Sequence, residues 1–256
     1  MTPVVKLLMM GDPGSGKTTC VGHTFPEPVL FLNFDRGGTE SITKRKLTNL
    51  TAAELEDVCS GKTKAEGVMV RDYFSEQQSV SLTLFRNPDG NVLSHFLVDI
   101  NRLMKANKFA TICIDSFTRM DEAIMDFVLG AQGKKSPELQ HYKFQQDKKH
   151  ELLTTILANV ERMPGLKAFV VIAHVEVVKI EALGEVRILP TGVGAKYQQT
   201  VAGLFSQVVF ATTEPALSGQ KFVAWTQPKN FVKGLKLRGY SKPSTVELSW
   251  QALFGD

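Results

Sequence analysis

The chain has 256 residues, of which 43% are hydrophobic and 22% charged, and this is the composition of a soluble globular protein with a sizeable core. No apolar run reaches the length of a bilayer span, and the N-terminal run lacks a signal-peptide cleavage site, so we expect no membrane partner and no export. The formal net charge of +4 permits a nucleic-acid partner without demonstrating one.

The three cysteines, Cys20, Cys59 and Cys113, are an odd number without metal-type spacing. We expect reduced and mostly buried thiols, as in a cytoplasmic protein.

The first predicted element is a short apolar run, residues 4–10, which suits a buried parallel strand. The sequence Gly11-Asp12-Pro13-Gly14-Ser15-Gly16-Lys17-Thr18 follows and reads G-x-x-x-x-G-K-T, and residues 18–21 can open a helix. A strand, a glycine-rich loop and a helix in this order are typical of the P-loop that binds nucleotide phosphates. The alternative is a glycine-rich turn with a solvated lysine.

Each position of the motif has a chemical role in binding a triphosphate. Gly14 and Gly16 let the backbone curl so that N–H groups point at phosphate oxygens, and the helix adds its positive N-terminal end. Lys17 places a charge on the β- and γ-phosphates, and the Thr18 hydroxyl ligates Mg²⁺. We therefore expect ATP and Mg²⁺ as cofactors. The predicted nucleotide contacts are Gly11, Asp12, Pro13, Gly14, Ser15, Gly16, Lys17, Thr18 and Thr19.

The next elements alternate between strands and helices. Residues 29–34 predict a second buried strand, residues 40–79 a more polar helical excursion with loops, and residues 81–85 a strand. Apolar residues at helical spacing predict a helix over 93–104, and residues 110–115 predict a third buried strand.

After two more predicted helices and a strand, the sequence pattern changes to short alternating segments. Residues 116–130 and a long helix ended by Pro164-Gly165 precede a fourth buried strand over 168–173. Short alternating segments then predict hairpins, at 175–180, 186–189, 208–211, 222–225 and 231–237. The pattern predicts one α/β domain over residues 1–256, with a mostly parallel central sheet flanked by helices and an antiparallel β extension at the C-terminal side.

Two acidic residues follow buried strands and are candidates for the chemistry. Asp115 ends the third strand, as a Walker B carboxylate that holds Mg²⁺ does; the alternative is a strand-end Asp that caps the next helix. Ser116 follows it instead of Glu, so the base that orients the attacking water must lie elsewhere. Asp35, just past the second strand, is the candidate, Glu40 is its rival, and a plain turn Asp is the alternative.

His174 closes the fourth strand. A polar side chain there could contact the γ-phosphate or bound water and report nucleotide state to the following segment. The alternative is a histidine whose hydrogen bonds are satisfied at the sheet edge.

Together these residues resemble the RecA-like core P-loop ATPases, and most closely the small single-domain phage proteins that act in recombination and single-strand annealing. The resemblance is carried by the P-loop and by three softer segments: 34–38, 112–116 and 171–174. Lys236-Leu237-Arg238 is similar to the Lys-x-Arg finger that RecA- and DnaB-type proteins insert into a neighbour's site, which gives Lys236 and Arg238 a catalytic role; a solvated edge strand is the alternative.

The chain departs from the family pattern in two ways. The acid after the second strand is Asp instead of Glu, which implies slower hydrolysis or a different water geometry. Lys17 and Asp115 lie 98 residues apart, which is long for a minimal core, so residues 40–79 are interpreted as an insertion.

The resemblance implies a Mg²⁺-dependent, DNA-stimulated ATPase in the cytoplasm, catalysed by Lys17, Asp35, Asp115 and His174 with the finger in trans. It implies single-stranded DNA, further copies of the chain in a ring or filament, and a single-strand-binding or annealing protein as partners. Residues 132–136 and 175–199 fall where the family has its DNA loops, although a solvated hairpin would look the same. The predicted DNA contacts are Lys179, Arg187, Lys196 and Tyr197.

Three other functions stay open. The first is a helicase-like ring ATPase or a helicase loader. The second is a P-loop kinase, although the arginine-rich lid it would need is not found in the sequence. The third is a nucleotide-gated interaction module with negligible turnover.

Overall fold

A computed structural model describes residues 3–35, 37–42, 44–73, 92–134, 136–180, 184–191, 200–217 and 219–255. The strands are β1 (Val5–Met10), β2 (Val29–Asn33), β3 (Leu47–Leu50), β4 (Val68–Asp72), β5 (Thr111–Asp115), β6 (Ala168–Ala173), β7 (Val175–Ile180), β8 (Glu185–Pro190), β9 (Gln207–Ala216), β10 (Gly219–Trp225), β11 (Lys236–Leu237) and β12 (Thr245–Glu247). The α-helices are α1 (Lys17–Thr24), α2 (Ala52–Ser60), α4 (Val92–Ala106), α5 (Phe117–Ala131), α6 (Leu139–Asn159) and α8 (Trp250–Phe254); short 3₁₀ helices are η1 (Thr39–Ser41), η4 (Val160–Arg162) and η6 (Ala202–Leu204).

One large sheet forms the centre of the molecule. Within the described residues its strand order is β12-β10-β9-β1-β6-β5-β2-β4-β3, and β11 pairs with β9. All pairings from β9 to β3 are parallel, whereas β10, β11 and β12 add antiparallel pairings at the C-terminal side. The predicted fold class, an α/β fold with a mostly parallel central sheet and an antiparallel extension at the C-terminal side, is therefore confirmed.

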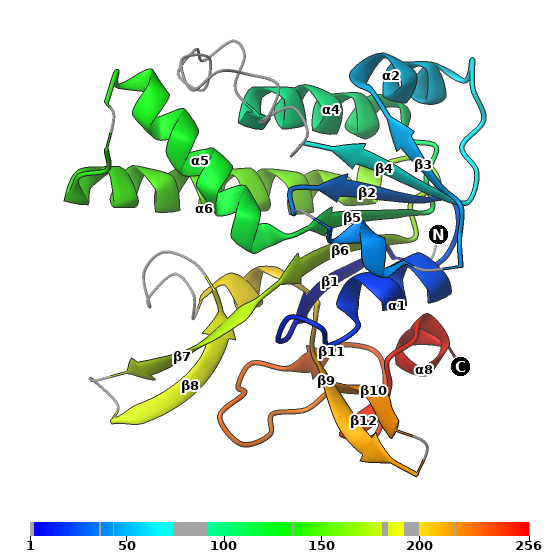
Figure 1. Ribbon diagram of the computed structural model, residues 1–256, viewed down its shortest axis with the longest axis vertical. Coiled ribbons are helices and arrows are strands. Elements are labelled where there is room, and N and C mark those ends of the chain that lie inside the picture. The colour runs from blue at the N-terminus through cyan, green and yellow to red at the C-terminus, as the bar shows by residue number, and fades with distance from the viewer. Residues whose placement is uncertain are drawn as a thin grey trace.

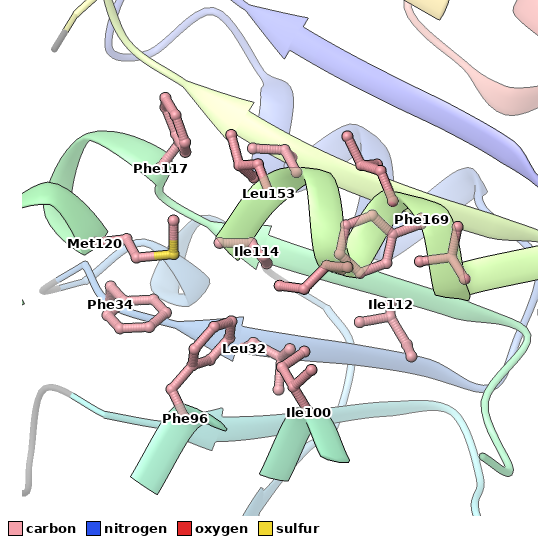
Figure 2. Packing of buried hydrophobic residues seen from close by; sticks show 14 of the residues in the cluster. Leu32, Phe34, Phe96, Ile100, Ile112, Ile114, Phe117, Met120, Leu153 and Phe169 are labelled. Atoms are coloured by element: carbon pink, nitrogen blue, oxygen red, sulfur yellow. The ribbon is translucent and has the colours of Figure 1, made fainter. Parts of the chain in front are cut away.

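Helices cover both faces of this sheet, as parallel strands buried on both faces require (Figure 1). Helices α4, α5 and α6 lie on one face, and α1 and α8 lie on the other. Figure 2 shows the core under the first set, where side chains of β2, β5 and β6 meet those of the helices. Its labelled residues are Leu32, Phe34, Phe96, Ile100, Ile112, Ile114, Phe117, Met120, Leu153 and Phe169.

The predicted helical excursion over residues 40–79 is wrong in part, because this segment also adds two strands to the parallel sheet. Strand β4 pairs with β2, and β3 pairs with β4 at the sheet edge. Among the described residues of the segment, α2, which begins with a capping box between Thr51 and Glu54, and the end of η1 match the helical prediction. The apolar run of β4 is short and ends in Arg71, whose charge is neutralised inside the protein by Asp99 of α4 at 2.9 Å. The strand predicted at 81–85 lies outside the described residues.

The antiparallel part also differs in detail from the prediction. Segment 208–211 belongs to the ten-residue strand β9, which pairs parallel with β1 and antiparallel with β10. Segment 231–237 is a strand only at β11, because Gly234, with φ of 77°, turns the chain just before it. The predicted hairpin of 175–180 with 186–189 is present as the separate two-stranded sheet β7–β8, which projects from the body of the molecule (Figure 1).

The predicted burial of the cysteines agrees with the structure. Cys20, Cys59 and Cys113 are free and buried. None of the helices in the described ranges combines the length and the apolar character that crossing a bilayer demands.

Candidate nucleotide-binding site

The P-loop, residues 11–18, connects the buried strand β1 to α1 and is held between two neighbouring strands. The Gly11 N–H donates a 3.2 Å hydrogen bond to the carbonyl oxygen of Ala173 in β6. A Cβ atom on Gly11 would collide with the carbonyl oxygen of Ala211 in β9. Gly16 has φ of 81° and no side-chain cap, so the first N–H groups of α1 remain available to an anion.

Lys17 is a buried cation folded against its own loop. Its Nζ atom donates to the carbonyl oxygens of Gly11 and Asp12, both at 2.7 Å, and to Oγ of Ser15 at 3.2 Å. Burial lowers the pKa of Lys17 to about 8, although the charges of Asp115, Asp12 and Asp35 act in the opposite direction. A bound phosphate would supply the negative charge that this site lacks.

The two predicted metal ligands lie together. The Thr18 hydroxyl donates a 2.7 Å hydrogen bond to Oδ2 of Asp115, which ends β5. Burial raises the pKa of Asp115 to about 6, with a smaller upward contribution from Asp35, while the Thr18 hydrogen bond and the charges of Lys17 and His174 lower it. A hydroxyl and one carboxylate are oxygen donors that suit Mg²⁺, which takes few protein ligands and relies on phosphates and water for the rest.

Among the residues that the structure describes, no group of three or more His, Cys, Asp or Glu could hold a metal ion. Mg²⁺ at Thr18 and Asp115 would therefore depend on nucleotide oxygens, as it does in phosphoryl-transfer sites.

The order β1-β6-β5-β2 brings four strand ends to one edge of the sheet. At these strand ends lie the P-loop, His174, Asp115 and Asp35, in that order. The Nε2 atom of His174 lies 3.4 Å from Oδ2 of Asp35, and the His174 N–H donates to Oγ1 of Thr118 at 3.2 Å. Nδ1 of His174 is buried and has no hydrogen-bond partner among the described residues.

A cavity of about 360 Å³ lies over this edge. Asp35, Asp115 and His174 line it together with most of the P-loop, whereas Glu40 does not. Glu40 instead places its carboxylate over Gly37, where an added Cβ would lie 3.2 Å from its Oε2 atom. The geometry thus favours Asp35 over Glu40 as the base. The described lining residues are Pro13, Gly14, Ser15, Gly16, Lys17, Thr18, Thr19, Asp35, Gly37, Gly38, Ser41, Asp115, Ile172, His174 and Phe222.

Two residues at the site were not predicted from the sequence. Arg119, in the first turn of α5, has its Nε atom 3.8 Å from Oδ1 of Asp35, and it also pairs with Glu122. Its position three residues after Ser116 is the only signal that the sequence offers. Phe222 of β10 lines the cavity from the far side of the P-loop. The sequence does not predict this position, because it depends on the order of β10, β9 and β1 in the sheet.

The predicted finger does not reach the cavity of its own chain. Lys236 lies in β11 opposite Val208, near the start of β9, and Arg238 is exposed just beyond it. Neither is among the described residues that line the nucleotide cavity. Burial lowers the pKa of Lys236, and the charge of Arg238 lowers it further. Any role of this pair in catalysis would have to be on a neighbouring subunit.

The predicted DNA residues are only partly placed. Lys179 is exposed on β7, whereas Arg187 on β8 donates two hydrogen bonds to Oε2 of Glu185, at 3.0 and 2.9 Å. Lys196 and Tyr197 lie outside the described residues. Lys134, in the other candidate loop, pairs with Glu138 at 3.1 Å.

A family model and a number of solved structures match this chain. No curated protein matched the sequence. A crystal structure of the KaiC-like protein PH0186 from the hyperthermophilic archaeon Pyrococcus horikoshii OT3 has a TM-score of 0.47 and 13% sequence identity, over 96% of this chain and 85% of that one. The family described as AAA domain matches residues 4–234. Because this match spans well over half of the 256 residues, the chain belongs to the AAA-domain family.

Proposed function

We propose that the protein is a Mg²⁺-dependent ATPase. The observation that carries this proposal is the 2.7 Å hydrogen bond from Thr18 of the P-loop to Asp115, 97 residues away, beside the buried cation of Lys17. Membership of the AAA-domain family supports ATP binding at this site. The cavity beside these groups has space for the phosphates and is bordered by donors on the P-loop side and carboxylates on the other.

In this proposal, some residues of the chain bind the nucleotide and Mg²⁺, and another promotes hydrolysis. Thr18 and Asp115 would hold Mg²⁺, which neutralises charge on the β- and γ-phosphates when it is bound. Lys17 binds the same phosphates, and the N–H groups at the start of α1 receive the remaining charge. Asp35 orients the attacking water and accepts its proton.

His174 keeps the Asp35 carboxylate in place from one side and Arg119 from the other, at 3.4 and 3.8 Å. Both therefore act through Asp35 as positioning residues. In this arrangement the loss of either one lowers turnover more than it lowers nucleotide affinity.

The finer part of the proposal is that ATP controls binding to single-stranded DNA, in recombination or strand annealing of the phage type. Hairpin β7–β8 supports it, because both of its strands meet at His174. Strand β7 begins at the next residue, and the Thr191 N–H after β8 donates to the His174 carbonyl oxygen at 2.8 Å. A change at the γ-phosphate would thus be transmitted to a hairpin that carries the exposed Lys179.

One observation favours a second candidate, a nucleotide-gated module that binds another protein. Val177 and Val186 of the same hairpin are 71% and 39% exposed, and Arg187 is already paired with Glu185. Apolar exposure of this kind suits a protein partner better than a phosphate backbone.

The test is the ATP turnover of the purified protein with and without single-stranded DNA, beside Thr18→Ala as an inactive control. Turnover that requires Mg²⁺ and rises with single-stranded DNA supports both levels of the proposal. Turnover that DNA leaves unchanged keeps the ATPase and removes the DNA partner. Equal, negligible turnover by both proteins, under all conditions, favours the interaction module.

A further inference from the structure

We propose that Phe222 is the platform on which the base of the bound nucleotide stacks. This inference rests on the proposed function, since it concerns the same cavity, and it adds the end of the ligand that the P-loop does not touch. Phe222 is 44% exposed although it lies within strand β10, and it lines the nucleotide cavity together with Gly16 and Thr19.

The ring lies directly on the backbone of the P-loop. A Cβ atom on Gly16 would be 2.7 Å from Cδ1 of Phe222 and 3.0 Å from its Cγ, so only glycine at this position leaves room for the ring. The contact occurs where α1 begins, next to the N–H groups that receive phosphate. Phe222 is therefore within reach of a ligand whose phosphates lie on the loop.

The sheet order indicates which end of the nucleotide lies near Phe222. In the order β10-β9-β1-β6-β5-β2, β1 and its P-loop stand between Phe222 on one side and His174, Asp115 and Asp35 on the other. The γ-phosphate belongs on the side of the carboxylates, where Mg²⁺ and the attacking water are needed. The rest of the nucleotide then extends toward Phe222.

The sheet also fixes the backbone that carries the ring in advance of binding. Phe222 pairs with Thr213 of β9, and its carbonyl oxygen accepts a hydrogen bond from the Leu248 N–H at 3.2 Å. A ring on a strand that is held from both sides, and that lies against Gly16, loses little freedom when a base stacks on it. A purine presents a larger π face than a pyrimidine, so we expect ATP and GTP to bind better than CTP. Because both purines present such a face, we expect little discrimination between ATP and GTP.

The experiment compares the binding of Mg²⁺-ATP, Mg²⁺-GTP, Mg²⁺-CTP and inorganic tripolyphosphate to the wild type and three variants by calorimetry. Phe222→Ala should weaken ATP binding about 5- to 150-fold, the loss of one stacked base, and should leave tripolyphosphate affinity unchanged. Phe222→Tyr should retain most of the affinity. Phe231→Ala is the matched control, because Phe231 is 57% exposed but does not line the cavity.

Each other outcome has a definite meaning. If Phe222→Ala binds ATP as the wild type does, the platform is wrong while the ATPase stands. If the same variant loses ATP and tripolyphosphate equally, the ring supports the P-loop and not the base, and the inference fails. If the wild type binds no nucleotide, the proposed function fails and the inference fails with it.

Discussion

The Nε2 atom of His174 lies 3.4 Å from Oδ2 of Asp35, although 139 residues separate the two in the chain. The contact exists because β6 and β2 flank β5 in the sheet, so the residues that follow all three strands share one edge. Asp35 is thereby set beside Asp115, the proposed Mg²⁺ ligand, and 22% of its side chain is exposed. This is the environment of a group that orients water.

Asp35→Asn should keep Mg²⁺-ATP binding and lose hydrolysis, because an amide of the same shape cannot accept the proton of the attacking water. Glu40→Gln is the matched control, since Glu40 stands five residues later and outside the cavity lining. The measurements are the affinity for ATP and the turnover number of each variant. Normal turnover by Asp35→Asn together with a loss in Glu40→Gln would reverse the assignment.

Asp115→Asn should stabilise the protein without ligands while it removes Mg²⁺-dependent nucleotide binding. Burial raises the pKa of Asp115 from 3.8 to about 6. Between these values the folded protein binds the proton more tightly than the unfolded chain, so stability falls as pH rises from about 3.8 to about 6. The difference corresponds to at most roughly 3 kcal/mol, which the neutral amide would restore above pH 6.

The measurement for Asp115→Asn is the free energy of unfolding at pH 5 and pH 8, with and without Mg²⁺-ATP. The free energy of unfolding of the variant should exceed that of the wild type at pH 8 and exceed it by less at pH 5. Mg²⁺-ATP should not raise it further. A variant less stable than the wild type at pH 8 would show that the Thr18 hydrogen bond outweighs the cost of burying the charge.

ATP affinity should fall as pH rises above about 8. Burial lowers the pKa of Lys17 to about 8, so above this pH the free site holds a neutral amine, and binding of phosphate must first take up a proton. The affinity should drop by about tenfold per pH unit beyond that point. Titrations from pH 7 to 9.5 test this, and Lys17→Ala should bind weakly at every pH with a flat profile. A wild-type affinity that is constant over the range contradicts the assignment.

The elements that follow strong local patterns were predictable from the sequence, and those that depend on distant pairing were not. The P-loop and β6 were placed at their observed bounds because each is a compact signal: a motif, and six apolar residues before a histidine. Strand β4 was missed because its burial depends on pairing with β2, which the sequence does not reveal. Phe222 and Arg119 were missed for the same reason: their relation to the site exists only after the sheet order and the start of α5 are known.

The finger should act between subunits. Lys236 and Arg238 lie outside the described lining of their own cavity, so in this proposal their charge stabilises the transition state on a neighbour's nucleotide. Arg238→Ala and Lys17→Ala should each be inactive alone, and a mixture should recover activity, because one interface then carries both intact halves. Specific activity should also rise steeply with protein concentration. A monomer whose specific activity does not depend on concentration would refute the finger.

Nucleotide and single-stranded DNA should strengthen each other's binding through hairpin β7–β8. Each basic residue that reaches a phosphate contributes about −0.7 to the slope of log affinity against log salt. We expect Lys179→Ala and Lys196→Ala each to remove this contribution, and Arg187→Ala to change the slope less, because Arg187 is already neutralised by Glu185. Tyr197→Ala should cost about 1–3 kcal/mol if the ring stacks on a base.

The measurement is fluorescence anisotropy of a labelled oligonucleotide across a salt series, with ATP, with ADP and without nucleotide. Lys105→Ala, on the exposed side of α4, is the control for a change of net charge alone. Linkage requires that any factor by which ATP tightens DNA binding appears equally when DNA tightens ATP binding. His174→Ala should reduce this factor and leave the DNA affinity without nucleotide unchanged, because His174 joins the cavity to both strands of the hairpin. A DNA affinity that neither nucleotide alters, and that the hairpin variants leave as it is in the control, would remove DNA from the function and leave the exposed valines of the hairpin as the surface to explain.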